Sequence, residues 1–262
     1  MRPGSGPADL SSKASDLSNV VSLAGRFDAA ALEALCVDNA APEFGEIKTA
    51  KDQMTALVLA VSELIADHPV RPSGYVREQS AFRPVCDLMR RSGWTFCGSG
   101  YYSAAFYRNG LAMKIGFKPE DSGLMYAAWC RANQRRAGVP IVHKLLSKGL
   151  CYAVLMDRLE AIAGELSPGD PMYDPQLAAE VDSVKETINL GIDGWGRHMD
   201  LCRTAIDIRE FFSDIANFDI HEANVMLDRY GNVVITDPVS FVGDYQSFAP
   251  SSGDVSTYRR YG

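Results

Sequence analysis

The spacing of apolar residues changes at residue 94, from a helical period to the shorter runs that are typical of strands. Before this point, apolar positions recur every three or four residues over residues 20–39, 50–67 and 82–92. Such spacing places one apolar stripe along a helix, so each range is predicted to form a helix. No residue in this part has an obvious chemical role, and we expect residues 1–92 to form a helical N-terminal region.

Beyond residue 94 the pattern predicts strands. Residues 94–97, 103–107 and 111–117 are apolar runs separated by glycine-containing turns, and residues 142–146 and 151–156 form a second group. Between the two groups, Pro119 can open a helix that runs to Arg136. We therefore expect a small antiparallel sheet with one helix inserted into it.

Helical spacing returns over residues 175–190 and 197–217. Two apolar triplets, at residues 225–227 and 233–235, then flank an Arg-Tyr-Gly-Asn turn and predict a hairpin. The order of helices and strands places the chain in the α+β class.

Composition narrows the classes of function. The chain has 262 residues, of which 47% are hydrophobic, so it can build a substantial core. Its net charge of −7 argues against broad nucleic-acid binding, which needs a basic surface. No apolar run approaches eighteen residues, and the N-terminus lacks the apolar centre of a signal peptide. Six scattered cysteines favour free thiols over disulfides or zinc. We expect neither direct nucleic-acid binding nor a membrane span.

The stretch around the predicted hairpin carries candidate chemistry. Asp219 precedes Asn224 by five residues, and Asp237 follows the second apolar triplet. Phosphoryl transfer uses one carboxylate for the attacking hydroxyl, and a carboxamide and a second carboxylate for Mg²⁺. The hairpin would bring Asp237 beside Asn224, as in protein kinases. The alternative is an ordinary surface hairpin with polar ends.

A glycine-containing turn and a lone lysine extend this pattern. Backbone amides at Gly98, Ser99, Gly100, Tyr101 and Ser103 could approach a phosphate. Lys114 stands in the next apolar strand, where a kinase has its phosphate-binding lysine. The alternatives are a plain glycine-rich hairpin and a lysine that protects an edge strand.

Two further positions complete a nucleotide site. Glu120 is the glutamate of the helix predicted after Pro119 and is a candidate partner for Lys114, although it could equally be an N-terminal helix charge. The segment from Met156 to Leu159 lies where the hinge of a kinase would receive adenine.

Together these motifs resemble the early serine/threonine protein kinases of short-tailed, podovirus-type coliphages. The resemblance covers residues 94–241, and its most specific stretches are Phe-Lys-Pro-Glu-Asp-Ser-Gly at 117–123 and Ile-Thr-Asp-Pro-Val-Ser-Phe at 235–241. It implies a protein-kinase-like two-lobed fold, ATP and Mg²⁺ as cofactors, and transfer to serine or threonine of bacterial host proteins. In that family the targets include host RNA polymerase and RNA-processing enzymes, which implies action in the cytoplasm of the infected host.

The sequence also departs from these relatives. The family's long basic C-terminal extension is absent, so host-transcription shutoff is not expected. Asn217-Phe218 precede Asp219 in place of His-Arg, so no arginine stands there to read a phosphorylated loop. His221 replaces the lysine that usually follows the catalytic aspartate, as in aminoglycoside-kinase-like enzymes, and could contact the γ-phosphate or brace the loop.

These observations predict a helical region at 1–92, a kinase N-lobe at 93–157 and a reduced helical C-lobe with a short tail at 158–262. Asp219 would orient the acceptor hydroxyl, Lys114 would hold the α/β-phosphates, and His221 would contact the γ-phosphate or brace the loop. Asn224 and Asp237 would bind Mg²⁺. The hydroxyl-rich tail at 247–257 is an expected site of self-phosphorylation, because it is tethered near the site. A small-molecule phosphotransferase and a host-protein-binding inhibitor with a vestigial kinase site are the alternatives.

Overall fold

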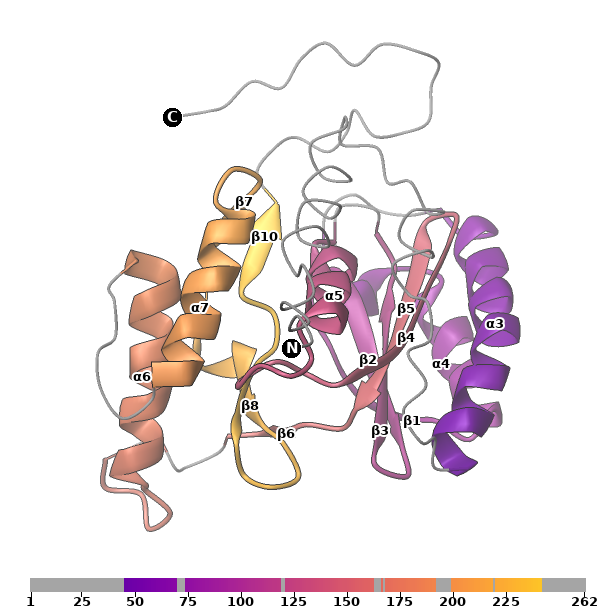
Figure 1. The fold of residues 1–262 in the computed structure, drawn as a ribbon. Helices are drawn as coiled ribbons and strands as arrows, with labels where there is room; N and C mark the ends of the chain where they lie inside the picture. The colour runs from indigo at the N-terminus through magenta and orange to yellow at the C-terminus, as the bar shows by residue number, and fades with distance from the viewer. Residues whose placement is uncertain are drawn as a thin grey trace, which may run out of the picture.

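The computed structural model describes residues 45–69, 74–118, 121–162, 166, 168–191, 199–218 and 220–241 (Figure 1). Several sequence-based predictions lie outside these residues, namely the helix at 20–39, Glu120, Asp219 and the tail at 247–257.

A five-stranded antiparallel sheet forms the centre of the first half of the chain. Its strand order is β1-β2-β3-β5-β4, and every neighbouring pair is antiparallel. The strands are β1 (Thr95–Ser99), β2 (Ser103–Arg108), β3 (Leu111–Gly116), β4 (Val142–Lys148) and β5 (Cys151–Asp157). All five match the ranges that the apolar runs predict to within a few residues.

Helices cover both faces of this sheet. The helices α3 (Gly45–Ala66) and α4 (Phe82–Arg91) lie on one face, and α5 (Gly123–Ala132) lies on the other (Figure 1). Strand β5 shows the consequence, because Ala153 and Leu155 join the core under α3 and α4, while Tyr152 and Val154 join the core around α5. Successive side chains of a strand point to opposite faces, so burial on both faces explains its continuous apolar sequence.

The second half of the chain adds two helices and two small sheets. The helices are α6 (Pro175–Leu190) and α7 (Met199–Phe212), and Asp174 caps the first by accepting hydrogen bonds from the amides of Gln176 and Leu177. Strands β6 (Glu160–Ala161), β8 (Val225–Leu227) and β9 (Val233–Ile235) form one sheet, and β7 (Ala216–Phe218) pairs with β10 (Val239–Phe241). The predicted hairpin is confirmed as β8 and β9.

Two predicted helices have the wrong ends. The helix expected to run to residue 136 stops at Ala132, and residues 133–135 form turns, because Arg131 and Gln134 donate to backbone carbonyls at the start of β4. The helix expected over residues 197–217 stops at Phe212, and Ala216 to Phe218 form a strand because they pair with β10. In both places a contact with a strand outside the helix outweighs local helix propensity.

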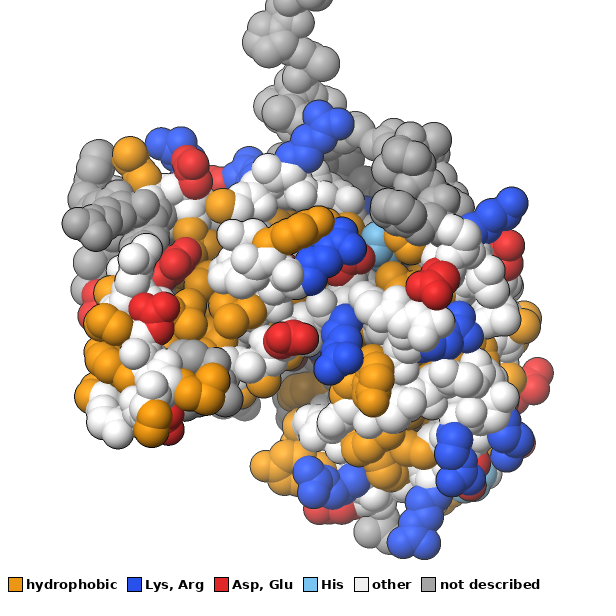
Figure 2. Space-filling model, turned by 90° about the horizontal axis from the view of Figure 1, so that it is seen from below, with side chains coloured by type: hydrophobic (Ala, Val, Ile, Leu, Met, Phe, Trp, Pro, Cys, Tyr) orange, Lys and Arg blue, Asp and Glu red, His pale blue; other side chains and the backbone are white. Residues whose placement is uncertain are grey.

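The architecture is α+β, as the sequence predicts. The part with α6 and α7 stands beside the five-stranded sheet, and from below the surface is notched between the two (Figure 2). No helix in the described ranges is long and apolar enough to cross a membrane. The domain division at residues 92 and 157 stays a prediction, although α3 and α4 share one hydrophobic core with the sheet.

Candidate active site

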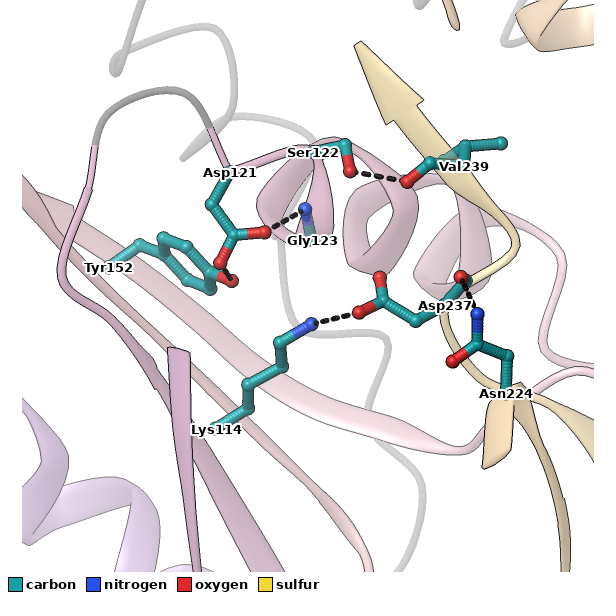
Figure 3. A network of polar contacts seen from close by, with 8 residues as sticks. All are labelled: Lys114, Asp121, Ser122, Gly123, Tyr152, Asn224, Asp237 and Val239. Atoms are coloured by element: carbon teal, nitrogen blue, oxygen red, sulfur yellow. Dashed lines mark hydrogen bonds and ion pairs between the residues drawn. The ribbon is translucent and has the colours of Figure 1, made fainter. Parts of the chain in front are cut away.

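The two halves of the chain meet at an ion pair between Lys114 and Asp237. Lys114 Nζ lies 3.1 Å from Asp237 Oδ2, and the two side chains are 22% and 41% exposed (Figure 3). Lys114 points to this side because its neighbours Met113 and Ile115 belong to the core under α3 and α4. The strand lysine and the last aspartate of the predicted site are therefore in direct contact, 123 residues apart in sequence.

Helix α5 fixes the backbone on both sides of Asp237. The Tyr126 hydroxyl donates to the Ile235 carbonyl at 2.7 Å, and the Ser122 hydroxyl donates to the Val239 carbonyl at 2.5 Å. Both hydrogen bonds are buried, where such bonds are costly to lose. Asp237 therefore occupies a short segment with anchors two residues before it and two residues after it.

Asn224 binds the same segment from the other side. Its side-chain Nδ2 donates to the backbone carbonyl of Asp237 at 2.9 Å, and the backbone carbonyl of Asn224 accepts from the Thr236 amide at 2.8 Å. This placement follows from the hairpin, in which Val225 pairs with Ile235. Because the amide nitrogen is committed to a carbonyl, the oxygen is the atom that Asn224 would offer to a cation.

Asp237 has one oxygen that suits a cation. Its Oδ1 is buried and has no hydrogen-bond partner among the described residues, whereas Oδ2 faces Lys114. A buried carboxylate oxygen without a partner is costly unless a ligand satisfies it. The described residues contain no cluster of three His, Cys, Asp or Glu side chains that could hold a metal alone. Magnesium, however, is commonly held by one or two protein ligands together with phosphate oxygens, so Asp237 and Asn224 fit it.

A second carboxylate lies beside Lys114, and it is Asp121. Asp121 is only 3% exposed; it accepts hydrogen bonds from the Tyr152 hydroxyl and, at 2.8 Å, from the Gly123 amide (Figure 3). A Cβ added at Gly123 would lie 2.7 Å from Lys114 Nζ and 2.9 Å from Asp121 Oδ1. The Lys114 ammonium and the Asp121 carboxylate thus lie on either side of the position that a Cβ of residue 123 would occupy, and only glycine leaves this position empty.

These charges shift each other's titration. Burial alone would lower the pKa of Lys114, but the carboxylates of Asp237 and Asp121 outweigh it and raise this pKa, so the lysine stays charged. Burial raises the pKa of Asp121, and the Asp237 charge adds to this, while Lys114 and the Tyr152 hydrogen bond oppose it. The lysine is therefore held as a cation between two carboxylates.

Sequence reasoning chose Glu120 as the partner of Lys114 and missed Asp121. Glu120 lies outside the described residues, so its role stays a prediction. The adjacent Asp121 has the burial, hydrogen bonds and charge interaction that a partner needs. A usable signal was Gly123, because a glycine at the start of a helix two residues after a carboxylate indicates a close approach.

The glycine turn joins β1 to β2, but it is shorter than predicted, because Gly98 and Ser99 belong to β1 and pair with Ala105 and Ala104. One amide of the remaining turn is also engaged. The Gly100 amide donates to the Ser103 carbonyl at 2.9 Å and closes the turn, while a Cβ at Gly98 or Gly100 would meet no atom within 4 Å. Open space beside both glycines leaves room for a ligand there. Ser103 also reaches the Tyr152 hydroxyl, which connects the turn to Asp121.

The N-terminal segment braces this turn. The Gly100 carbonyl accepts from the Val76 amide at 3.1 Å, and Lys118 donates to the Gly74 carbonyl at 2.7 Å. Lys118 is 1% exposed, and its Nζ lies 3.5 Å from the centre of the Tyr101 ring, a favourable cation–π contact. The role of residues before 92 was open from sequence, and at least residues 74–76 support the glycine turn.

The remaining predicted residues lie on three different segments. Met156 is half-buried in β5, and Leu159 lies in the two-residue link between β5 and β6. His221 is exposed and directly precedes the short helix η3 (Glu222–Asn224), whose Asn224 amide donates to its carbonyl at 2.9 Å. The roles assigned to these three residues stay predictions.

Comparison with known proteins agrees with this geometry. A family model described as Bacteriophage T7 protein kinase 0.7 matches residues 45–254. No curated protein matches the chain. The matched range covers well over half of the 262 residues and includes Lys114, Asn224 and Asp237. The resemblance to phage kinases is thereby confirmed, and the chain belongs to the bacteriophage T7 protein kinase 0.7 family.

Proposed function

We propose that this phage protein kinase uses ATP and Mg²⁺ to phosphorylate serine and threonine residues of bacterial host proteins, on a two-lobed kinase-like fold. The contact between Lys114 and Asp237 carries the proposal, because it joins the strand lysine of one half to the metal-binding aspartate of the other. The five-stranded sheet would be the N-lobe, and the part with α6 and α7 the C-lobe. The notch between them supports a ligand site there.

Each residue then has a defined task. Lys114 binds phosphate oxygens as a cation, and Asp121, which is held by the Tyr152 hydroxyl and the Gly123 amide, supplies a negative charge near it. Asp237 and Asn224 hold Mg²⁺, which supplies positive charge against the phosphates during transfer. The acceptor hydroxyl gives its proton to Asp219, whose role is inferred from its place five residues before Asn224.

Positioning accounts for most of the catalysis that this set can provide. Phosphoryl transfer requires little covalent chemistry from a protein and depends on aligned charges. The anchors at Ile235, Asp237 and Val239 keep the metal-binding carboxylate in place before any ligand arrives. Such preorganisation lowers the reorganisation needed at the moment of transfer.

The proposed acceptors are host proteins in the cytoplasm of the infected bacterium, with RNA polymerase and RNA-processing enzymes as candidates from the family resemblance. Serines and threonine in residues 247–257 are proposed acceptors for self-phosphorylation. The experiment is incubation of the purified protein with Mg²⁺-ATP and host lysate, followed by mass spectrometry. We expect phosphoserine and phosphothreonine on lysate proteins and on the tail.

The control is Lys114→Met, which should abolish these marks. Absence of protein phosphorylation, together with transfer to small hydroxyl compounds, would replace this proposal with a small-molecule phosphotransferase. Absence of any transfer would favour a host-protein-binding inhibitor.

A further inference from the structure

The end of helix α6 contacts the backbone immediately after Asp219. Asn189 Nδ2 donates to the Ile220 carbonyl at 2.9 Å, and Asn189 Oδ1 accepts from the Ile220 amide at 3.0 Å. One carboxamide therefore satisfies both backbone polar groups of one residue, 31 positions away in sequence. Two hydrogen bonds from a single planar group fix an orientation as well as a distance.

Arg209 on α7 holds the segment that carries Asn189. Its Nη1 donates to the carbonyls of Ile188 and Asn189, the latter at 3.2 Å, where the last carbonyls of α6 lack helical partners. The helix then ends at Gly191, with φ of 70°, and a Cβ there would lie 3.0 Å from Arg209 Nε. The guanidinium also lies 5.1 Å from the centre of the Phe218 ring. Arg209 therefore joins the end of α6 to strand β7.

Both sequence neighbours of Asp219 have contacts of their own. Phe218 pairs with Val239 in the β7–β10 ladder and contacts Arg209, while Ile220 is held by Asn189 and its side chain is 2% exposed. The residues on either side of the proposed base are therefore held in place.

We propose that Asn189 is a positioning residue for Asp219, orienting the peptide that follows the base, with Arg209 keeping Asn189 in place. This inference rests on the proposed function, in which Asp219 receives the acceptor proton. The hydrogen bonds of the Asn189 side chain go to Ile220, whereas Lys114 and Asp237 pair with each other. Its loss should therefore affect transfer and leave nucleotide binding unchanged.

The chemistry of the side chain explains the choice of asparagine. A carboxamide presents one donor and one acceptor in a plane, which matches the carbonyl and amide of a single residue. Aspartate at the same position keeps the acceptor for the Ile220 amide but loses the donor and places a charge near the Ile220 carbonyl. Alanine keeps neither contact. The three side chains therefore form a graded series in hydrogen bonding, and aspartate also keeps the size of asparagine.

The experiment measures kcat and the KM for ATP with casein as acceptor protein for the wild type, Asn189→Asp and Asn189→Ala. We expect Asn189→Ala to lower kcat by about 10- to 100-fold, since displacement of a reacting group by about 1 Å has effects of this size. The KM for ATP should stay within about twofold, and Asn189→Asp should fall between the other two. Asn232→Ala is the matched control, because it removes an exposed hydrogen bond from a side-chain amide to Asp228, at the tip of the β8–β9 hairpin.

Asp219→Asn separates this inference from the proposed function. If Asn189 acts through the base, Asn189→Ala should cause no further loss in the Asp219→Asn background, because residues that act as a unit are not additive. If Asp219→Asn is inactive while Asn189→Ala matches Asn232→Ala, the positioning role is wrong and the proposed function stands. If Asp219→Asn retains normal transfer, both are wrong. A lower thermal midpoint with unchanged kcat per folded molecule would assign Asn189 a structural role only.

Discussion

The lack of a Cβ at Gly123 gives the sharpest test of the site. A Cβ there would lie 2.5 Å from the Tyr152 hydroxyl, 2.7 Å from Lys114 Nζ and 2.9 Å from Asp121 Oδ1. Ordinary contacts of a Cβ begin at 3.4 Å, so Gly123→Ala requires all three of these contacts to lengthen. The question is which group yields.

Lys114 should move furthest, because the other two groups are more tightly held and can give way only together with the backbone at Gly123. The Tyr152 ring lies so close to Gly116 that a Cβ there would be 1.9 Å from it, and its hydroxyl bonds to Asp121. Asp121 is short and bonded to the Gly123 amide itself. The end of a lysine side chain is flexible, and retreating from 2.7 to 3.4 Å displaces its ammonium by about 0.7 Å.

A shift of this size should affect catalysis more than folding. Misplacement by about 1 Å can cost roughly 100-fold in rate, so we expect kcat/KM for ATP to fall by roughly 10- to 100-fold. Overpacking costs about 1–3 kcal/mol, and alanine in a helix regains up to about 1 kcal/mol over glycine. The thermal midpoint should therefore fall by no more than about 12 °C, which leaves the variant folded at 25 °C.

The assay is transfer from radiolabelled ATP together with thermal unfolding of the same samples. Gly45→Ala is the matched control, because Gly45 begins α3 and a Cβ there meets no atom within 4 Å. Activity of Gly123→Ala within about twofold of this control would refute the reasoning that Lys114 needs the space.

Three further predictions test the charges. Asp237→Asn should reduce kcat on the order of 1,000-fold or more by weakening the metal site. The thermal midpoint should stay similar, because Asn224 binds the backbone carbonyl of residue 237. Near-normal turnover would show that Asp237 is not a metal ligand. Lys114→Met should abolish nucleotide binding, measured by calorimetry, with an unchanged thermal midpoint; lower stability with intact activity per folded molecule would make the lysine structural. Burial raises the pKa of Asp121, so its contribution to the free energy of unfolding is largest below about pH 4 and declines as pH rises through the raised pKa. Asp121→Asn should remove that decline from the thermal midpoint measured against pH, and parallel curves for the two proteins would contradict it.

The sequence predicts the parts of the site that depend on order along the chain. Lys114 in a strand, and Asn224 and Asp237 on either side of a hairpin, follow from apolar runs and turn residues, and the structure brings them together. These residues are separated by regular elements whose geometry is known in advance. Their proximity could therefore be inferred without coordinates.

The parts that sequence reasoning missed depend on packing between distant segments. Gly123 to Cys130 are all buried, so α5 has no polar face to indicate which of Glu120 and Asp121 turns toward Lys114. The strands β7 and β10 have three residues each and exist because they pair with each other. Asn189 reads as an ordinary polar residue near a helix end, and only the approach of Ile220 gives it a partner.

The cover that α3 forms over the sheet also sets the order in which the chain can fold during synthesis. Its buried residues, such as Met54 and Val61, pack with Ala153 and Leu155 of β5, and its Lys51 carbonyl accepts a hydrogen bond from Lys144 in β4. At about 5–20 residues per second, the roughly 90 residues between the ends of α3 and β5 take about 5–20 s to synthesise. During that interval β5 has not yet been made, so the apolar face of α3 lacks its partner in the sheet. The nascent chain therefore offers an apolar binding site for chaperones.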